Sequence, residues 1–168
     1  LVDFALAALV FWLAAHWGFK RALQARLLAV LHIAFLWAGA AFVLYGLDSL
    51  ARFLGLAWSA GWAPLHAAGI GFFGAMLIGM ASRVSLGHSG RALQADVTTW
   101  WLFWLLQGAA LLRMLPDLMT DMLPSTLPST LPATLTNAAG VLWLGVFLVW
   151  FWKYAPMTWR PRVDGKPG

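Results

Sequence analysis

Four histidines are the side chains of this sequence that best suit a metal or a haem: His16, His32, His66 and His88. Imidazole is a common ligand of haem iron and of copper. His32 and His66 fall inside long apolar runs, where a polar side chain without a partner is costly, so they are the stronger candidates. For His32, a ligand role and a hydrogen bond between helices explain the residue equally well. His16 is better explained by a side chain that reaches back to the membrane interface.

His66 and His88 mark the two ends of one informative stretch, HAAGIGFFGAMLIGMASRVSLGHSGRAL, residues 66–93. A small residue recurs at every fourth position of this stretch, which predicts one ridge of small residues along a helix. The ridge consists of Ala67, Gly71, Ala75 and Gly79. It would admit either another helix or the flat face of a porphyrin, and the second alternative makes His66 the leading haem ligand. Because 22 residues of regular helix rise about 33 Å, His66 and His88 are expected in separate sites.

The end of this stretch is rich in hydrogen-bond donors, with Arg83, His88 and Arg91 separated by serines and glycines. Such a loop could hold haem propionates or another anion, because arginine pairs bidentately with carboxylates. It could equally be a basic anchor with a tight turn. Further along, Gln107 is interpreted as a residue that joins helices, and Arg113 is a second buried polar candidate. The sequence contains no paired catalytic acids, no nucleophile triad and no phosphate-binding loop.

The composition requires these residues to be positioned by membrane helices. Of 168 residues, 62% are hydrophobic, only 10% are charged and none is cysteine. That balance is typical of an integral membrane protein rather than a soluble domain. The absence of cysteine excludes disulfides and thiolate-held metal clusters. The net charge of +5 is better explained by basic loops beside a membrane than by nucleic-acid binding.

Five apolar runs approach the ~20 residues that a bilayer requires. They cover residues 1–19, 27–47, 62–83, 98–115 and 136–153. Because a lone span in lipid must satisfy its own backbone groups, the predicted fold is an all-α bundle of five transmembrane helices. Residues 116–135 contain the repeats LPST, LPST and LPAT, which predict an external Pro/Thr-rich loop. Residues 154–168 form a polar tail.

The basic residues predict the orientation of this bundle, because cytoplasmic loops of membrane proteins are enriched in lysine and arginine. Of the eleven basic residues, only Arg52 and Arg113 fall on the other side. The remaining nine are Lys20, Arg21, Arg26, Arg83, Arg91, Lys153, Arg160, Arg162 and Lys166. The C-terminus is therefore predicted to be cytoplasmic. The chain begins with Leu1 and lacks a basic leader, so we expect it to be the C-terminal part of a longer protein.

Three blocks of this sequence resemble the NnrS family of bacterial membrane proteins. The first is residues 65–93, with its terminal RVSLGHSGRAL; the second is residues 26–48; the third is the closing YAPMTWRPRVDGKPG. The resemblance implies a multi-pass protein of about twelve helices in the bacterial inner membrane, of which this chain would be the last part. It also implies bound haem, of b type, and copper. The implied role is in nitric oxide metabolism, as in denitrification, or in resistance to nitrosative stress, with nitric oxide or a related small molecule as ligand.

Carried onto this sequence, the resemblance implies that His66 is the haem ligand and that His88 and His32 are the next metal ligands. Arg83 and Arg91 would contact propionates or shape the site. Two alternatives remain open: a transporter or structural membrane subunit without a cofactor, and a b-type cytochrome that transfers electrons without copper.

Overall fold

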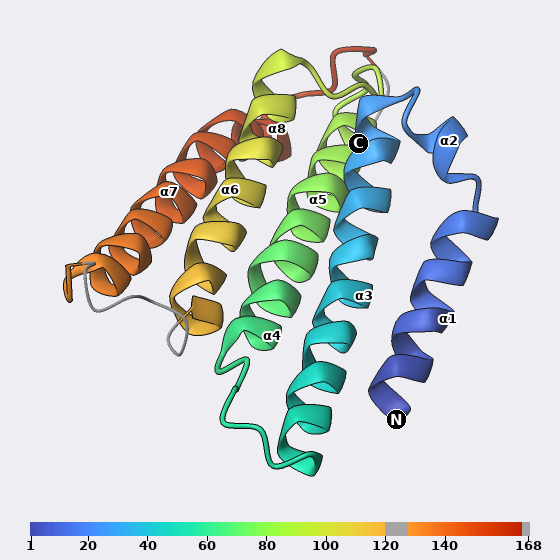
Figure 1. Cartoon of the computed structure of the whole chain (residues 1–168). Helices are drawn as coiled ribbons and strands as arrows, with labels where there is room; N and C mark the ends of the chain where they lie inside the picture. The colour runs from blue at the N-terminus through green and yellow to red at the C-terminus, as the bar shows by residue number, and fades with distance from the viewer. Residues whose placement is uncertain (120–127, 166–168) are drawn as a thin grey trace.

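The structure, a computed structural model, describes residues 1–119 and 128–165, and every regular element in these ranges is a helix (Figure 1). The elements are α1 (Val2–His16), α2 (Phe19–Ala22), α3 (Arg26–Phe53), α4 (Ala63–His66), the π-helical segment η1 (Ala67–Gly74), α5 (Ala75–His88), α6 (Val97–Met119), α7 (Leu131–Tyr154) and α8 (Pro156–Trp159). The predicted all-α fold is confirmed. The chain passes from α4 through η1 into α5 without leaving the helical conformation.

Four helical segments are long and apolar enough to cross a membrane: Arg26–Phe53, Ala63–His88, Val97–Met119 and Leu131–Trp159. Each overlaps one of the spans expected from residue 27 onward. α1 is shorter, with 15 residues, and ends before the span expected at residues 1–19 does. The reason is Gly18, whose φ of 77° lies in the left-handed region and turns the chain into α2.

The ends of the expected loop at residues 116–135 are helical, and residues 120–127 lie outside the described ranges. α6 continues through Pro116 to Met119, four residues beyond the expected span. α7 begins at Leu131, because Pro132 is tolerated in the first turn of a helix, where its missing N–H would have no partner. The last proline repeat therefore starts a helix.

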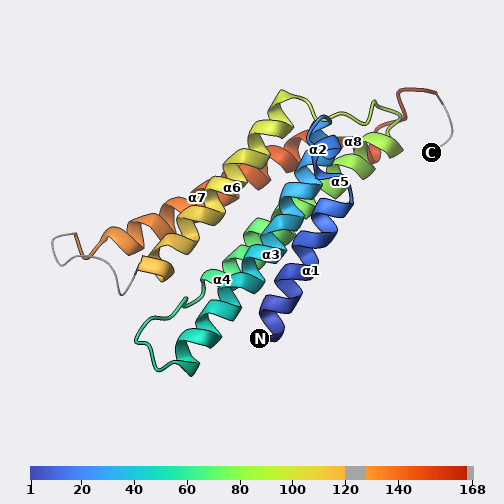
Figure 2. The ribbon, with the colours of Figure 1, turned by 45° about the vertical axis from the view of Figure 1, so that its right-hand side comes forward.

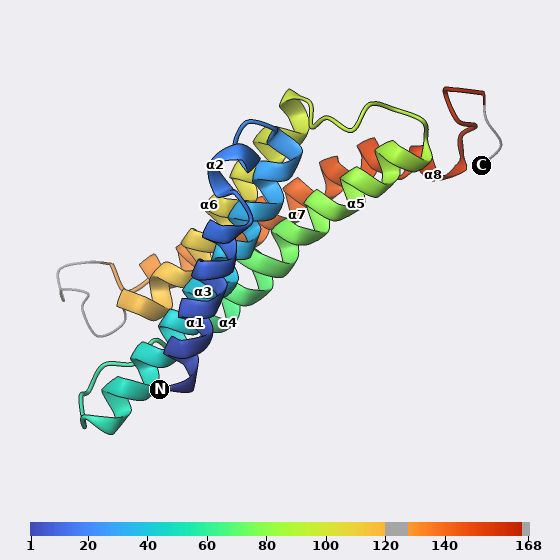
Figure 3. The same cartoon turned by 90° about the vertical axis from the view of Figure 1, so that its right-hand side faces the viewer.

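The helices lie side by side in the order α1, α3, α5, α6 and α7 (Figure 1). Turned by 45°, the view still shows α1 beside α3 and α6 beside α7 (Figure 2). α5 ends beside α8, and a long loop returns from there to α6 (Figure 3). We call the two ends of the bundle the α4 end and the α8 end. The basic residues expected in the cytoplasm belong, where described, to segments at the α8 end, whereas Arg52 and Arg113 belong to the α4 end.

The ridge of small residues is buried along its whole length and packs against α3. A Cβ atom added to Gly71 would overlap the indole ring of Trp37. A Cβ atom added to Gly79 would lie 2.7 Å from Cδ2 of Leu31. Of the two alternatives for this ridge, the structure selects the neighbouring helix over a porphyrin.

Trp37 also joins α3 to α6. Its Nε1 donates a hydrogen bond to Oε1 of Gln107, and Nε2 of Gln107 donates to the carbonyl of Phe103 at 3.3 Å. Gln107 is 5% exposed, and a buried amide without these partners would be costly. The interpretation of Gln107 as a residue that joins helices is confirmed.

We expect Gly71→Val to destabilise the bundle by about 1–3 kcal/mol, because the added methyl groups must displace the Trp37 ring from a packed interface. Gly145→Val is the matched control, since Gly145 is also helical and a Cβ there meets nothing within 4 Å. Thermal unfolding of the detergent-solubilised protein measures both. Equal losses would show that the cost comes from valine in a helix rather than from Trp37.

Candidate functional site

His66 lies at the α4 end, where α4 passes into η1, and faces a charged pair on α6. Its Nδ1 is 3.5 Å from Oδ2 of Asp117, and NH1 of Arg113 is 3.1 Å from the same oxygen. All three side chains are largely buried, with at most 23% exposed. Gly61, with a φ of 52°, allows the preceding loop to pass close to Asp117. The structure thus brings together a histidine, a carboxylate and a guanidinium, which we call the His66 cluster.

In the His66 cluster a carboxylate lies near the imidazole without making a hydrogen bond to it. At 3.5 Å the contact with Asp117 is longer than a hydrogen bond, and Nδ1 is buried with no hydrogen-bond partner among the described residues. The nearby carboxylate nevertheless favours the proton on Nδ1, which leaves the lone pair on Nε2. Arg113 balances the charge of Asp117.

Sequence reasoning missed Asp117, because the expected span ended at residue 115 and placed this aspartate in a loop. A signal was present in the sequence. Asp117 follows Arg113 by four residues, the spacing at which side chains of one helix face meet, and apolar residues surround both.

His32 lies in the second turn of α3, away from the His66 cluster. Its Nδ1 is 3.2 Å from the carbonyl oxygen of Leu28, and its Nε2 is buried with no hydrogen-bond partner in the described part of the chain. His16, by contrast, is exposed and stacks on Trp12 with ring centroids 4.8 Å apart. The hydrogen bond of His32 is thus made within α3, and the structure does not show the expected alternative of a hydrogen bond to another helix.

His88 is the last residue of α5, at the α8 end, and the helix stops in a hydrogen-bonded cap. The N–H of Arg91 donates to the carbonyl of Leu86 at 2.9 Å, and that of Gly90 to Gly87 at 3.2 Å. Gly90 has a φ of 73°, so this is a Schellman motif. The loop that the sequence predicted after residue 83 thus begins only after His88, because α5 continues through Ser85 and Gly87 to the cap at Gly90.

The C-terminal tail packs on this cap. The N–H of Val163 donates to the carbonyl of Ser89 at 3.0 Å, and NH1 of Arg162 donates to the carbonyl of His88 at 3.3 Å. Asp164 lies against Gly90, where a Cβ atom would be 2.7 Å from its carboxyl carbon. Two of the sequence blocks that carry the family resemblance, residues 65–93 and 154–168, are therefore in direct contact.

A cavity of about 520 Å³ lies between the tail and α5, and His88 lines it together with Arg160, Arg162 and Ser85. Arg83 is exposed, and Arg91 has one buried guanidinium nitrogen without a partner among the described residues. Neither is among the residues that line this cavity.

The candidate ligands do not converge on one centre. Within residues 1–119 and 128–165, no three histidine, aspartate or glutamate side chains gather into one group. His66 and Arg83 are 17 residues apart on one helical segment, which corresponds to about 25 Å. Arg83 and Arg91 therefore lie too far away to hold the propionates of a haem bound at His66.

The family described as NnrS protein matches residues 1–162 of the chain. The chain belongs to the NnrS family. No curated protein and no solved structure matches it. The match covers all the described helices, so this NnrS chain is a multi-pass membrane protein in which the His66 cluster, His32 and His88 occupy three separate places.

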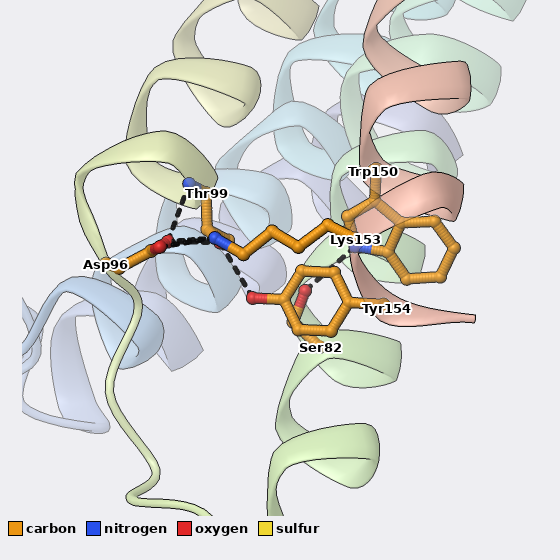
Figure 4. A network of polar contacts seen from close by, with 6 residues as sticks. All are labelled: Ser82, Asp96, Thr99, Trp150, Lys153 and Tyr154. Atoms are coloured by element: carbon orange, nitrogen blue, oxygen red, sulfur yellow. Dashed lines mark hydrogen bonds and ion pairs between the residues drawn. The ribbon is translucent and has the colours of Figure 1, made fainter. Parts of the chain in front are cut away.

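A second polar network in this NnrS chain joins α6 to α7 at the α8 end (Figure 4). Asp96 precedes α6 and accepts hydrogen bonds from the N–H of Thr99 at 3.0 Å and from its Oγ1 at 2.8 Å, which is an N-cap. Nζ of Lys153 on α7 contacts the same carboxylate. The Tyr154 hydroxyl is 2.7 Å from Oγ1 of Thr99. Nearby, Nε1 of Trp150 donates to Oγ of Ser82 at 2.9 Å and so ties α7 to α5.

Burial alone would raise the pKa of Asp96, but hydrogen bonds from Lys153 and Thr99 outweigh it and lower the pKa to about 2. The pKa of an aspartate in the unfolded chain is about 3.9, so this group stabilises the fold fully above that pH. The stabilisation is lost as the pH falls through about 4 towards 2. Because 56% of the Asp96 side chain is exposed, solvent screens the pair and the effect is modest.

We expect Asp96→Asn to reduce the dependence of stability on pH below pH 5, since asparagine still caps α6 but carries no charge. The measurement is the unfolding temperature of both proteins between pH 5 and pH 2. The wild type should lose more stability than the variant over this interval. Parallel profiles would mean that Asp96 titrates no differently in the folded and unfolded states.

Proposed function

We propose that this protein is a haem- and copper-containing membrane protein of nitric oxide metabolism, or of resistance to nitrosative stress, and that His66 is an axial ligand of its haem. The observation that supports this most directly is the His66 cluster, in which a carboxylate lies 3.5 Å from a buried Nδ1 that makes no hydrogen bond to the described residues. Histidines that bind metals usually donate the other ring N–H to a carboxylate, a backbone carbonyl or water, and here Oδ2 of Asp117 lies 3.5 Å from Nδ1. Membership of the NnrS family supports the choice of haem and copper.

An apolar space for a flat macrocycle would lie near His66, on a face of η1 that α3 does not cover, although His66 itself does not line it. A cavity of about 570 Å³ lies between the η1–α5 segment and α7 and begins at Gly69, three residues after His66. A Cβ atom at Gly69 would meet nothing within 4 Å, and aromatic rings such as Phe73, Trp143 and Phe147 line the cavity. The π-helical geometry of η1 is itself frequent at functional sites.

In this proposal each residue of the cluster has a defined task. His66 would hold the iron through Nε2, Asp117 would orient the imidazole and increase its basicity, and Arg113 would balance the charge of Asp117. The aromatic side chains would exclude water from the macrocycle. When bound, haem would supply a ferrous iron for nitric oxide, and copper would assist or supply electrons.

The remaining expectations belong to the same proposal. The basic α8 end would face the cytoplasm of a bacterial inner membrane, with the C-terminus inside. Helices from an N-terminal part of the protein would complete the bundle. Arg83 and Arg91 would shape the surroundings of His88, a further metal-ligand candidate, rather than contact a haem at His66.

We expect His66→Ala to remove one b-type haem per protein, because it deletes the axial nitrogen. A reduced-minus-oxidised spectrum with metal analysis of the full-length protein measures this, and His16→Ala is the control because His16 is exposed and stacked only on Trp12. Asp117→Asn should keep the fold but weaken haem retention about 10- to 100-fold.

Full haem content in His66→Ala would place the axial ligand elsewhere. A colourless, metal-free wild type from a haem-replete host would overturn the cofactor proposal and favour a transporter or structural subunit. Haem without copper would favour an electron-transferring cytochrome.

A further inference from the structure

A small cavity of about 160 Å³ lies beside His32, well separated from the His66 cluster. Its lining consists of Trp17, Leu28, Leu31, His32, Phe35 and Met76. The only nitrogen or sulfur atoms that these side chains contribute belong to the imidazole, the thioether and the indole. No carboxylate lines it.

The fold builds this cavity from three segments that are distant in the sequence. The left-handed turn at Gly18 directs Trp17 and Phe19 against α3, where Trp17 lies 5.1 Å from Phe35 and Phe19 lies 6.4 Å from His32, measured between ring centroids. The approach of the small-residue ridge to α3 brings in Met76 from the first turn of α5. His32 thereby shares one cavity with the aromatic rings of Trp17 and Phe35 and with Met76 of α5.

The protonation of His32 follows from its hydrogen bond. Nδ1 is 3.2 Å from the carbonyl oxygen of Leu28, which can only accept, so Nδ1 carries the proton. Nε2 therefore carries the lone pair, and it is buried with no hydrogen-bond partner among the described residues. A buried acceptor without a partner costs free energy, which a Lewis acid bound at Nε2 would recover.

The donor set selects the kind of ion. Magnesium and calcium require several oxygen ligands, and zinc prefers four donors, usually with thiolate or carboxylate among them. A neutral imidazole and a neutral thioether in an apolar cavity suit a soft, monovalent cation, which needs little charge compensation. An indole ring face adds attraction for a cation.

We propose that Nε2 of His32 and the sulfur of Met76 bind a cuprous ion beside the Trp17 ring. This inference rests on the proposed function only for the presence of copper in the protein, and it concerns a place that does not include the haem ligand. The two histidines belong to opposite ends of the bundle, so either proposal can fail without the other.

The test is anaerobic titration of the full-length detergent-solubilised protein with Cu(I) held by a chromophoric chelator. Met76→Leu removes the sulfur while nearly conserving the volume, and we expect it to weaken one Cu(I) site about 10- to 100-fold. His32→Gln should abolish that site. Met80→Leu is the matched control, because Met80 lies one turn further along α5, is 47% exposed and does not line the cavity.

X-ray absorption of the loaded wild type should show one nitrogen and one sulfur ligand at this site, and Met76→Leu should lose the sulfur. Equal Cu(I) affinity in Met76→Leu and Met80→Leu would overturn the proposal. Copper that remains bound in both Met76→Leu and His32→Gln would also overturn it, because such copper would be adventitious. A His66→Ala protein that keeps this Cu(I) site while losing haem would separate the two sites directly. If His66→Ala keeps its haem while Met76→Leu still loses the Cu(I) site, only the assignment of His66 as the haem ligand is refuted.

Discussion

The contact between Trp37 and Gly71 is the constraint on which the rest of the structure depends. Only a residue without a side chain leaves room for the indole ring against η1, and only the amide of Gln107 on α6 satisfies the indole N–H in this apolar interior. One side chain of α3 thus fixes the distances to two neighbouring segments. The two candidate sites lie on either side of this contact, because α4 ends at His66, just before η1, and α5 begins at Ala75, next to Met76.

α7 is held differently from the central helices. Its closest polar contacts lie at the α8 end, where Lys153 and Tyr154 meet Asp96 and Thr99, and where Trp150 reaches Ser82. Further along, α7 borders the apolar cavity that begins at Gly69. A helix that is pinned near one end by polar contacts and faces open apolar space at its middle is suited to cover a flat hydrophobic group.

Much of this arrangement follows from sequence pattern. Apolar runs of membrane length predicted the all-α bundle, and the four-residue period of small residues predicted a close helix contact, although not which partner would fill it. The early end of α1 at Gly18 and the continuation of α6 through Pro116 were not predicted, because tertiary packing decides whether a glycine or a proline ends a helix. That second difference concealed Asp117. The π-helical geometry of η1 was also missed, since no composition rule distinguishes it from an α-helix.

The two best candidate ligands, His66 and His32, have different neighbouring groups, and these groups favour different metals. His66 has a carboxylate near Nδ1, which makes its imidazole a stronger donor and suits an iron ion that changes its charge. His32 has only a backbone carbonyl behind Nδ1, and it shares its cavity with a thioether and aromatic rings. Neutral, soft surroundings stabilise the lower charge of a metal over the higher one. If both proposals hold, the neighbours of these two imidazoles would favour different metals at two places separated along the bundle by the Trp37 contact.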